Sequence, residues 1–257
     1  MMALKIIGGF FLGLVLAGVY HYFFIWLLTG SATATQVFVI ITGLIGGVYT
    51  AIAFAKNVYT IGFFSILGYI LDMTWSMLNT AAALLVWLPA CAVKGGNFLT
   101  PNANSKRSGT FVYSSNPRGG GFAATTIGTV IAGGWCSHEE VHVWQGRIFG
   151  PVYMIVYGLS WVFNVLFRLI IGKSSSLLME AYHRICFEDM AYWGGALSGS
   201  AINWGGWIGG FFVSLLCIGL FVSIPIGIVT GTHLLWIIGS VGLIIYFFVR
   251  VLTPKST

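Results

Sequence analysis

Long apolar runs separated by short polar stretches dominate this chain. A transmembrane helix needs about 20 predominantly apolar residues, and the pattern predicts about six such helices. The apolar runs span residues 6–28, 36–55, 59–93, 151–171, 204–224 and 232–251. The run 59–93 is longer than one crossing requires and contains Asp72 and Asn79, so it is either one tilted helix or a broken pair. The expected fold class is an all-α, polytopic transmembrane helical bundle.

Two segments between the apolar runs depart from this helical pattern. The segment 94–121 is rich in Gly, Pro, Asn and Ser, which predicts an exposed polar loop, with a short hairpin around residues 110–113. The segment 122–134, FAATTIGTVIAGG, holds β-branched residues between glycines. That composition favours a short strand or re-entrant segment over a long helix.

Composition supports an integral, multi-pass membrane protein whose surroundings are lipid. The chain is 58% hydrophobic and 7% charged, whereas soluble domains carry about 25% charged residues. Its net charge of +6 comes from basic residues at segment ends, where they set topology or meet anionic head groups. Nucleic acid is therefore not an expected partner.

We expect one integral membrane domain over residues 1–257. N-terminal helices (1–93) and the polar loop would precede a metal-site core (122–195), and C-terminal helices (196–257) would follow. Charge leaves the orientation open, because the sidedness depends on the run 59–93. Lys56 and the basic loop that follows this run lie on opposite sides if the run crosses once, and on one side if it is a broken hairpin.

The stretch CSHEEVHVWQGRIFG (136–150) contains an unusual share of the chain's ionisable residues. It holds two of the five histidines and two of the six acidic residues, and ionisable groups near lipid are costly and usually functional. His138, Glu139 and His142 fit H-E-x-x-H. Residues four apart share a helix face, so both imidazoles can bind one metal ion beside Glu139. With a third ligand and a bound water, this is the zinc-peptidase arrangement, which predicts Zn²⁺.

The third ligand is expected from the helix predicted at residues 176–195. Glu188 is the first choice and Glu180 the second. His183 lies near both in sequence and can serve as a ligand, a supporting partner or a transition-state donor. The four cysteines are expected to be small buried hydrophobes, although Cys136 and Cys186 lie near the polar motifs. The sequence has these cysteines at Cys91, Cys136, Cys186 and Cys217.

The stretch HEEVHVWQGRIFGPVYMIVYGLSW (138–161) resembles a widespread set of uncharacterised bacterial membrane proteins. They combine an H-E-x-x-H-x-x-Q helix, a Gly-Pro-x-Tyr helix start and a downstream helix with Glu, then Ala, then two Gly. The matching residues are His138, Glu139, His142, Gln145, Gly150, Pro151, Tyr153, Glu188, Ala191, Gly194 and Gly195.

That set is similar to the gluzincin-type (zincin-like) metallopeptidases. The similarity implies His138, His142 and Glu188 as zinc ligands, Glu139 as the general base, and a bacterial inner membrane location. Gluzincins often place an acid or amide four residues after the ligand Glu. This chain departs from the pattern, because it has Tyr192 there.

The expected function is a membrane-embedded zinc metallopeptidase acting on a membrane-associated protein or peptide. Glu139 would activate water, and His183 or Tyr192 would stabilise the oxyanion. One alternative is a non-catalytic subunit of a membrane complex, with or without a structural metal. Another is a di-iron oxidase with two Fe, because Glu139-x-x-His142 and Glu180-x-x-His183 are paired E-x-x-H motifs.

Asp72 has two further interpretations. It is the only upstream carboxylate that a di-iron site could recruit. It could also be the helix Asp of an intramembrane zinc protease of the site-two type. A helix-packing hydrogen bond to Thr74 or Asn79 is the simpler expectation. Single histidines in or near apolar spans, His21 and His233, are expected at packing or interface positions.

Overall fold

The computed structural model describes all residues except 1, 95, 120–122, 173–175, 198–201 and 253–257. The chain divides into two compact units, Met1–Pro151 and Val152–Thr257, and each is described by itself.

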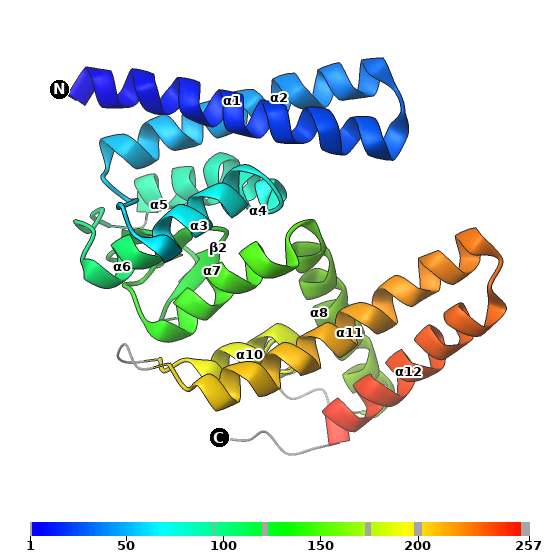
Figure 1. Ribbon diagram of the computed structural model, residues 1–257. Coiled ribbons are helices and arrows are strands. Elements are labelled where there is room, and N and C mark those ends of the chain that lie inside the picture. Colours follow the sequence, from blue (N-terminus) through cyan, green and yellow to red (C-terminus); the bar gives the residue numbers. More distant parts are fainter. Residues whose placement is uncertain (1, 95, 120–122, 173–175, 198–201, 253–257) are drawn as a thin grey trace. The chain divides into compact units, whose positions relative to one another are not determined.

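The first unit begins with an antiparallel pair of long helices, α1 (Met2–Thr29) and α2 (Ala32–Ala55), which lie side by side (Figure 1). Ser31 caps α2 by accepting a hydrogen bond from the Ala34 amide at 3.2 Å. Where the helices meet, a Cβ on Gly13 would lie 2.1 Å from the Gly46 carbonyl oxygen. Glycine at this position therefore allows the close backbone contact by which helices pack in lipid.

The apolar run 59–93 is a broken pair, which settles the alternative that the sequence left open. A short helix, α3 (Phe63–Met73), precedes a continuous helical stretch made of α4 (Met77–Ala82), the π-helical η1 (Ala83–Trp87) and α5 (Leu88–Lys94). Residues 74–76 form the break. There Thr74 Oγ1 donates to the Ile70 carbonyl at 2.6 Å, and the Ser76 amide donates to the Leu71 carbonyl at 2.8 Å.

A small sheet corrects the all-α expectation to a mostly helical fold. After α6 (Ala103–Ser108), the strands β1 (Phe111–Tyr113), β2 (Thr125–Ile127) and β3 (Val130–Ala132) pair in the order β1-β3-β2. The strand predicted within 122–134 is confirmed as β2 and β3, which are antiparallel; residue 122 lies outside the described residues.

The hairpin expected at 110–113 is wrong, because β1 is one strand paired in parallel with β3. Nor is the segment 94–121 simply an exposed loop. Its described residues include α6 and the buried strand β1. Phe111 packs in the core of the unit with Tyr49 of α2 and Trp87 of η1.

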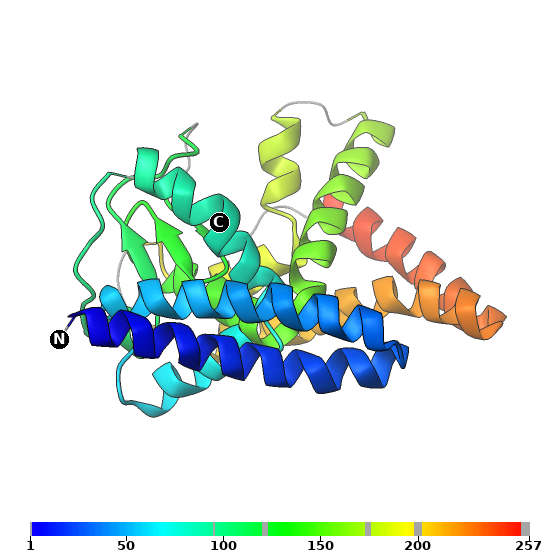
Figure 2. The same ribbon diagram turned by 90° about the horizontal axis from the view of Figure 1, so that it is seen from above.

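The last helix of the first unit is α7 (Ser137–Phe149), and α8 (Pro151–Ile170) begins at the boundary. The second unit continues with α9 (Leu177–Tyr182), α10 (Cys186–Gly194), α11 (Trp204–Thr230) and α12 (His233–Leu252). Helices α11 and α12 form a second hairpin (Figure 2). A Cβ on Gly210 of α11 would lie 2.3 Å from Met190 Cα of α10.

The single helix predicted over residues 176–195 is wrong, because the structure has two short helices there. Residues 183–185 separate α9 from α10. The side-chain amide of Asn164 in α8 donates to the Arg184 carbonyl at 3.0 Å. This bond satisfies a carbonyl that the interruption takes out of the helical ladder.

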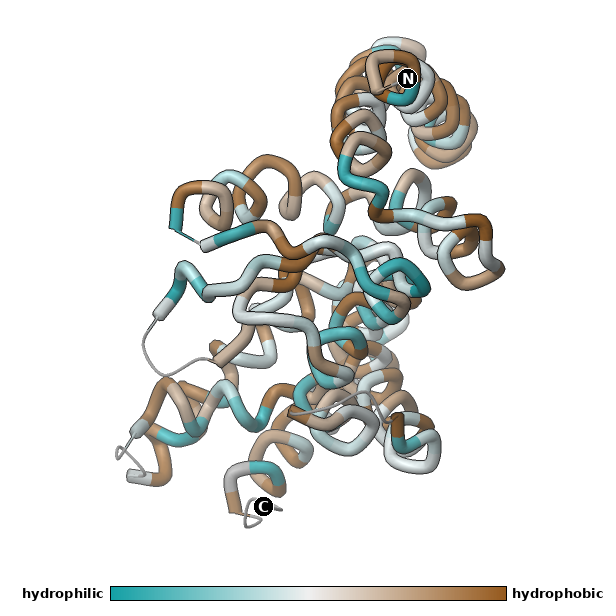
Figure 3. The backbone as a smooth tube through the Cα atoms, turned by 90° about the vertical axis from the view of Figure 1, so that its left-hand side faces the viewer, coloured by the Kyte–Doolittle hydropathy of each residue, from teal (hydrophilic) through white to brown (hydrophobic). Residues whose placement is uncertain are grey.

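Six helical stretches among the described residues are long and apolar enough to cross a membrane, as the hydrophobic pattern predicted. They are Met2–Thr29, Ala32–Ala55, Met77–Lys94, Pro151–Ile170, Trp204–Thr230 and His233–Arg250. Apolar residues dominate these helices in Figure 3, and many large ones are exposed, including Phe11, Ile40 and Phe212. Exposed apolar surface on that scale fits contact with lipid, so the chain is a multi-pass membrane protein.

Candidate metal centre

The helix α7 that carries H-E-x-x-H is anchored at its C-terminal end. Gly150, with φ +57°, ends it. The Gly146 carbonyl accepts hydrogen bonds from Ser76 Oγ and Asn79 Nδ2, each at 2.9 Å. Asn79 also donates to the Gly150 carbonyl at 2.9 Å. Side chains from the break before α4 and from α4 itself therefore bind carbonyls at the helix end, where the Gly146 carbonyl also accepts from the Gly150 amide at 3.0 Å.

The two histidines of the motif lie one turn apart on α7, with ring centroids separated by 4.9 Å and ring planes at 85°. Both are buried. His142 Nδ1 lies 2.8 Å from Gln145 Oε1. An amide oxygen only accepts, so Nδ1 carries the proton and the lone pair of Nε2 is available for a metal ion.

The neighbouring glutamates of the motif have different partners. Glu139 Oε2 accepts a hydrogen bond from Thr126 Oγ1 of β2 at 2.6 Å. Glu140 instead forms an ion pair with Arg107 at 3.3 Å. Burial raises the pKa of Glu140, and the charge of Arg107 opposes that shift. A carboxylate has several acceptor sites, so the bond from Thr126 orients Glu139 and still allows it to take a proton from water.

Asp72 forms a buried ion pair with Arg147 of α7. Arg147 Nε and Nη2 donate to the two carboxylate oxygens at 2.9 and 2.7 Å, and the Tyr59 hydroxyl donates to Oδ2 at 2.6 Å. Arg147 also donates to the carbonyls of Ser108 and Gly109. Burial alone would lower the pKa of Arg147, but the charge of Asp72 and its hydrogen bonds raise it overall.

This pairing corrects the expectation for Asp72. Its carboxylate binds Arg147 and Tyr59 rather than Thr74 or Asn79. The described residues include no metal-ligand group that contains Asp72. Its observed contacts therefore fasten α3 to α7.

Glu188, the first choice for the third ligand, lies in α10 and is fully buried. Its Oε1 accepts a hydrogen bond from the Tyr157 hydroxyl of α8 at 2.6 Å. Glu180, the second choice, lies in α9 with 36% of its side chain exposed and pairs with Arg168 at 3.7 Å. The structure therefore favours Glu188 over Glu180.

The two predicted oxyanion donors lie together in the second unit. The Tyr192 hydroxyl is 3.0 Å from His183 Nδ1. Other histidines have partners in their own helices. His21 Nδ1 lies 2.9 Å from the Ala17 carbonyl oxygen, and His233 Nδ1 accepts from Trp236 at 3.2 Å.

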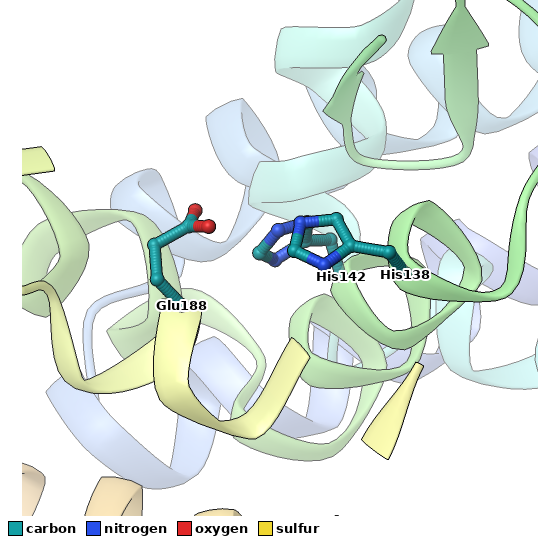
Figure 4. Close-up of side chains that lie close together, drawn as sticks. All are labelled: His138, His142 and Glu188. Atoms are coloured by element: carbon teal, nitrogen blue, oxygen red, sulfur yellow. The ribbon is translucent and has the colours of Figure 1, made fainter. Parts of the chain in front are cut away.

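His138, His142 and Glu188 are a group that could hold a metal ion. Each offers one ligand atom, and these atoms lie within 4.8 Å of one another (Figure 4). Two imidazole nitrogens and one carboxylate oxygen suit Zn²⁺ with an open position for water, and other transition ions accept the same donors. The donor chemistry thus fits a metal ion without specifying which one. Cys136 is outside this group, and burial raises its pKa, which favours the thiol over the metal-binding thiolate.

Gln145→Ala should weaken metal binding by about 10- to 100-fold, because partners that orient a ligating histidine contribute on this scale. A competition titration with a zinc-binding dye measures the affinity. Gln36→Ala, at an exposed position of α2, is the matched control and should change nothing. Equal affinity in wild type and Gln145→Ala would contradict the orienting role.

Sequence reasoning assigned no role to Thr126, Gln145 or Tyr157, whose side chains contact Glu139, His142 and Glu188 respectively. The contact of Gln145 with His142 was the easiest to expect from the sequence, since the two residues lie one helical turn apart. The contacts of Thr126 and Tyr157 cross between elements, and spacing alone gives no sign of them.

No protein-family model, curated protein or solved structure matches the chain.

Proposed function

We propose that this chain is a membrane-embedded zinc metallopeptidase, in which His138, His142 and Glu188 hold the ion and Glu139 is the general base. The observation that carries the proposal is the buried H-E-x-x-H pair beside a carboxylate, with ligand atoms within 4.8 Å. The hydrogen bonds from His142 to Gln145 and from Thr126 to Glu139 support it, because each orients a group for its expected task.

A zinc ion held by His138, His142 and Glu188 would supply a Lewis acid that lowers the pKa of a water molecule and polarises the scissile carbonyl. Glu139 takes the proton from that water and passes it to the leaving amine. The carboxylate is held for this step by Thr126. The His183 and Tyr192 pair offers a donor for the oxyanion that develops on the carbonyl.

The position of β2 favours a peptide as substrate. This strand is at an edge of the sheet, and its Thr126 contacts Glu139. An extended peptide can add to a sheet edge through backbone hydrogen bonds. Such a peptide beside β2 would bring its backbone close to the general base. The membrane spans favour a substrate that is itself membrane-associated.

The contacts of the other carboxylates disfavour the di-iron alternative. Such a site needs further bridging carboxylates from other helices. Asp72, Glu140 and Glu180 instead pair with Arg147, Arg107 and Arg168.

Removing the metal should abolish hydrolysis. The test incubates detergent-purified protein with a library of hydrophobic peptides and detects new termini by mass spectrometry. Cleavage should disappear after treatment with o-phenanthroline and return when Zn²⁺ is restored. Metal-loaded protein that cleaves nothing would contradict the peptidase proposal and leave an accessory subunit with a structural metal. Cleavage that survives chelation would indicate a contaminating peptidase.

A further inference from the structure

Five of the seven basic residues of the first unit gather at one end of its helices, whereas Arg107 and Arg147 pair with Glu140 and Asp72. Lys5 lies near the start of α1, and Lys56 follows the last residue of α2. These helices are antiparallel neighbours, so both residues lie at the same end. Lys5 Nζ donates to Asn57 Oδ1 at 3.0 Å, which joins the two directly.

The broken pair of helices returns the chain to this same end. Lys94 is the last residue of α5. Phe98 follows four residues later, and its ring centre lies 4.9 Å from Lys56 Nζ. Lys106 of α6 lines the same hollow as Lys56, and Arg118 lines a second hollow with Lys94. The basic end, as we call it, comprises Lys5, Lys56, Lys94, Lys106 and Arg118.

No exposed acid balances this charge. The carboxylates of the first unit are Asp72, Glu139 and Glu140, and all three are buried. Residues 30–31 between α1 and α2, and residues 74–76 at the break, carry no charge. Short loops rich in Lys and Arg remain on the cytoplasmic side of a membrane. The basic end of the first unit therefore belongs on the cytoplasmic side.

One hollow at this end has the donors that a phosphate needs. It has a volume of about 330 Å³, and its lining includes Lys56, Lys106, Thr60 and Thr100 but no carboxylate among the described residues. Ammonium groups bind phosphate as point charges, and hydroxyl groups donate hydrogen bonds to its oxygens. Lys56 caps a candidate membrane span, so the hollow lies at the depth of lipid head groups.

We propose that this hollow binds the phosphate head group of an anionic phospholipid in the cytoplasmic leaflet. The second hollow supports a lipid-facing role for the basic end, because there Lys94 and Arg118 lie beside Trp87, Ala90 and Val93. At the end of a membrane span, the cations can bind the anionic head group of a lipid, and the apolar residues can contact its acyl chains. This inference uses none of the proposed zinc ligands and does not depend on peptidase activity.

Native mass spectrometry in a neutral detergent tests the lipid site. Wild-type protein should bind phosphatidylglycerol in preference to phosphatidylcholine. The double variant Lys56→Gln/Lys106→Gln should weaken phosphatidylglycerol binding by about 10-fold or more, the scale expected for two basic residues near a membrane surface. Lys5→Gln removes one charge from the same end outside both hollows and should have a much smaller effect.

A loss per removed charge that is as large in Lys5→Gln as in the double variant would overturn the pocket assignment and leave diffuse attraction. Equal binding of the two lipids would overturn the preference for an anionic head group. Competition by inorganic phosphate as strong as that of the lipid would assign the hollow to a free anion instead.

Labelling with a membrane-impermeant maleimide tests the orientation in intact cells. The four native cysteines are buried, so introduced cysteines give the signal. Thr33→Cys, at the opposite end, should react from outside, and Ser115→Cys should react only after permeabilisation. The reverse pattern would overturn the assignment to the cytoplasmic leaflet.

Discussion

Glu139→Gln is expected to lower the rate of peptide hydrolysis by about 10²- to 10⁴-fold, the usual contribution of a general base, and to leave the metal bound. An amide has nearly the shape of the carboxylate, and its oxygen can still accept the hydrogen bond that Thr126 donates to Glu139. It cannot accept a proton from water. The loss should therefore appear in kcat rather than in metal content or folding.

Glu140→Gln is the matched control, because it makes the same change one residue away. Glu140 pairs with Arg107 rather than with Thr126, so hydrolysis in this variant should stay near the wild-type rate. Peptide cleavage and metal content are measured together on both variants. Hydrolysis that persists in Glu139→Gln would exclude Glu139 as the base, even if the metal site is intact.

Asp72→Asn is expected to lower the free energy of unfolding by about 3–5 kcal/mol, the cost of leaving one member of a buried ion pair without its counter-charge. Arg147 would remain buried and charged, although it would keep its bonds to the Ser108 and Gly109 carbonyls. The measurement is denaturant or thermal unfolding in detergent. Lys5→Gln, which changes an exposed residue, should shift the unfolding free energy by less than about 0.5 kcal/mol.

A double-mutant cycle separates this ion pair from a general packing effect. Combining Asp72→Asn with Arg147→Met removes both charges, so the double variant should be less destabilised than the sum of the two single variants. Additive losses would show that the two residues do not act as a pair.

The membrane spans and the motif helix were predictable because their signals are local. Apolar length alone predicts α1, α2 and α8, and spacing of four residues places His138 and His142 on one face of α7. The sequence leaves two alternatives for the region of α3 and α4, one helix or a broken pair, since residues 74–76 contain neither Gly nor Pro.

Features that rest on contacts distant in sequence were not predictable. The interruption of the helix predicted at 176–195 involves a bond from Asn164 to the Arg184 carbonyl. The parallel pairing of β1 with β3 joins segments whose sequences give no sign of it. Asp72 and Arg147 are 75 residues apart, so the partner of Asp72 was misassigned to its own helix region. The residues alone rank Glu188 before Glu180 without deciding between them, and the resemblance implies Glu188.

Metal content by mass spectrometry on detergent-purified protein tests the central claim most directly. We expect about one zinc ion per chain in the wild type and in Glu180→Gln, and loss of that ion in His138→Ala and Glu188→Gln. Circular dichroism of each variant checks that the helices remain folded. Zinc retained at the wild-type level in folded His138→Ala and Glu188→Gln, or no metal in the wild type, would contradict the account.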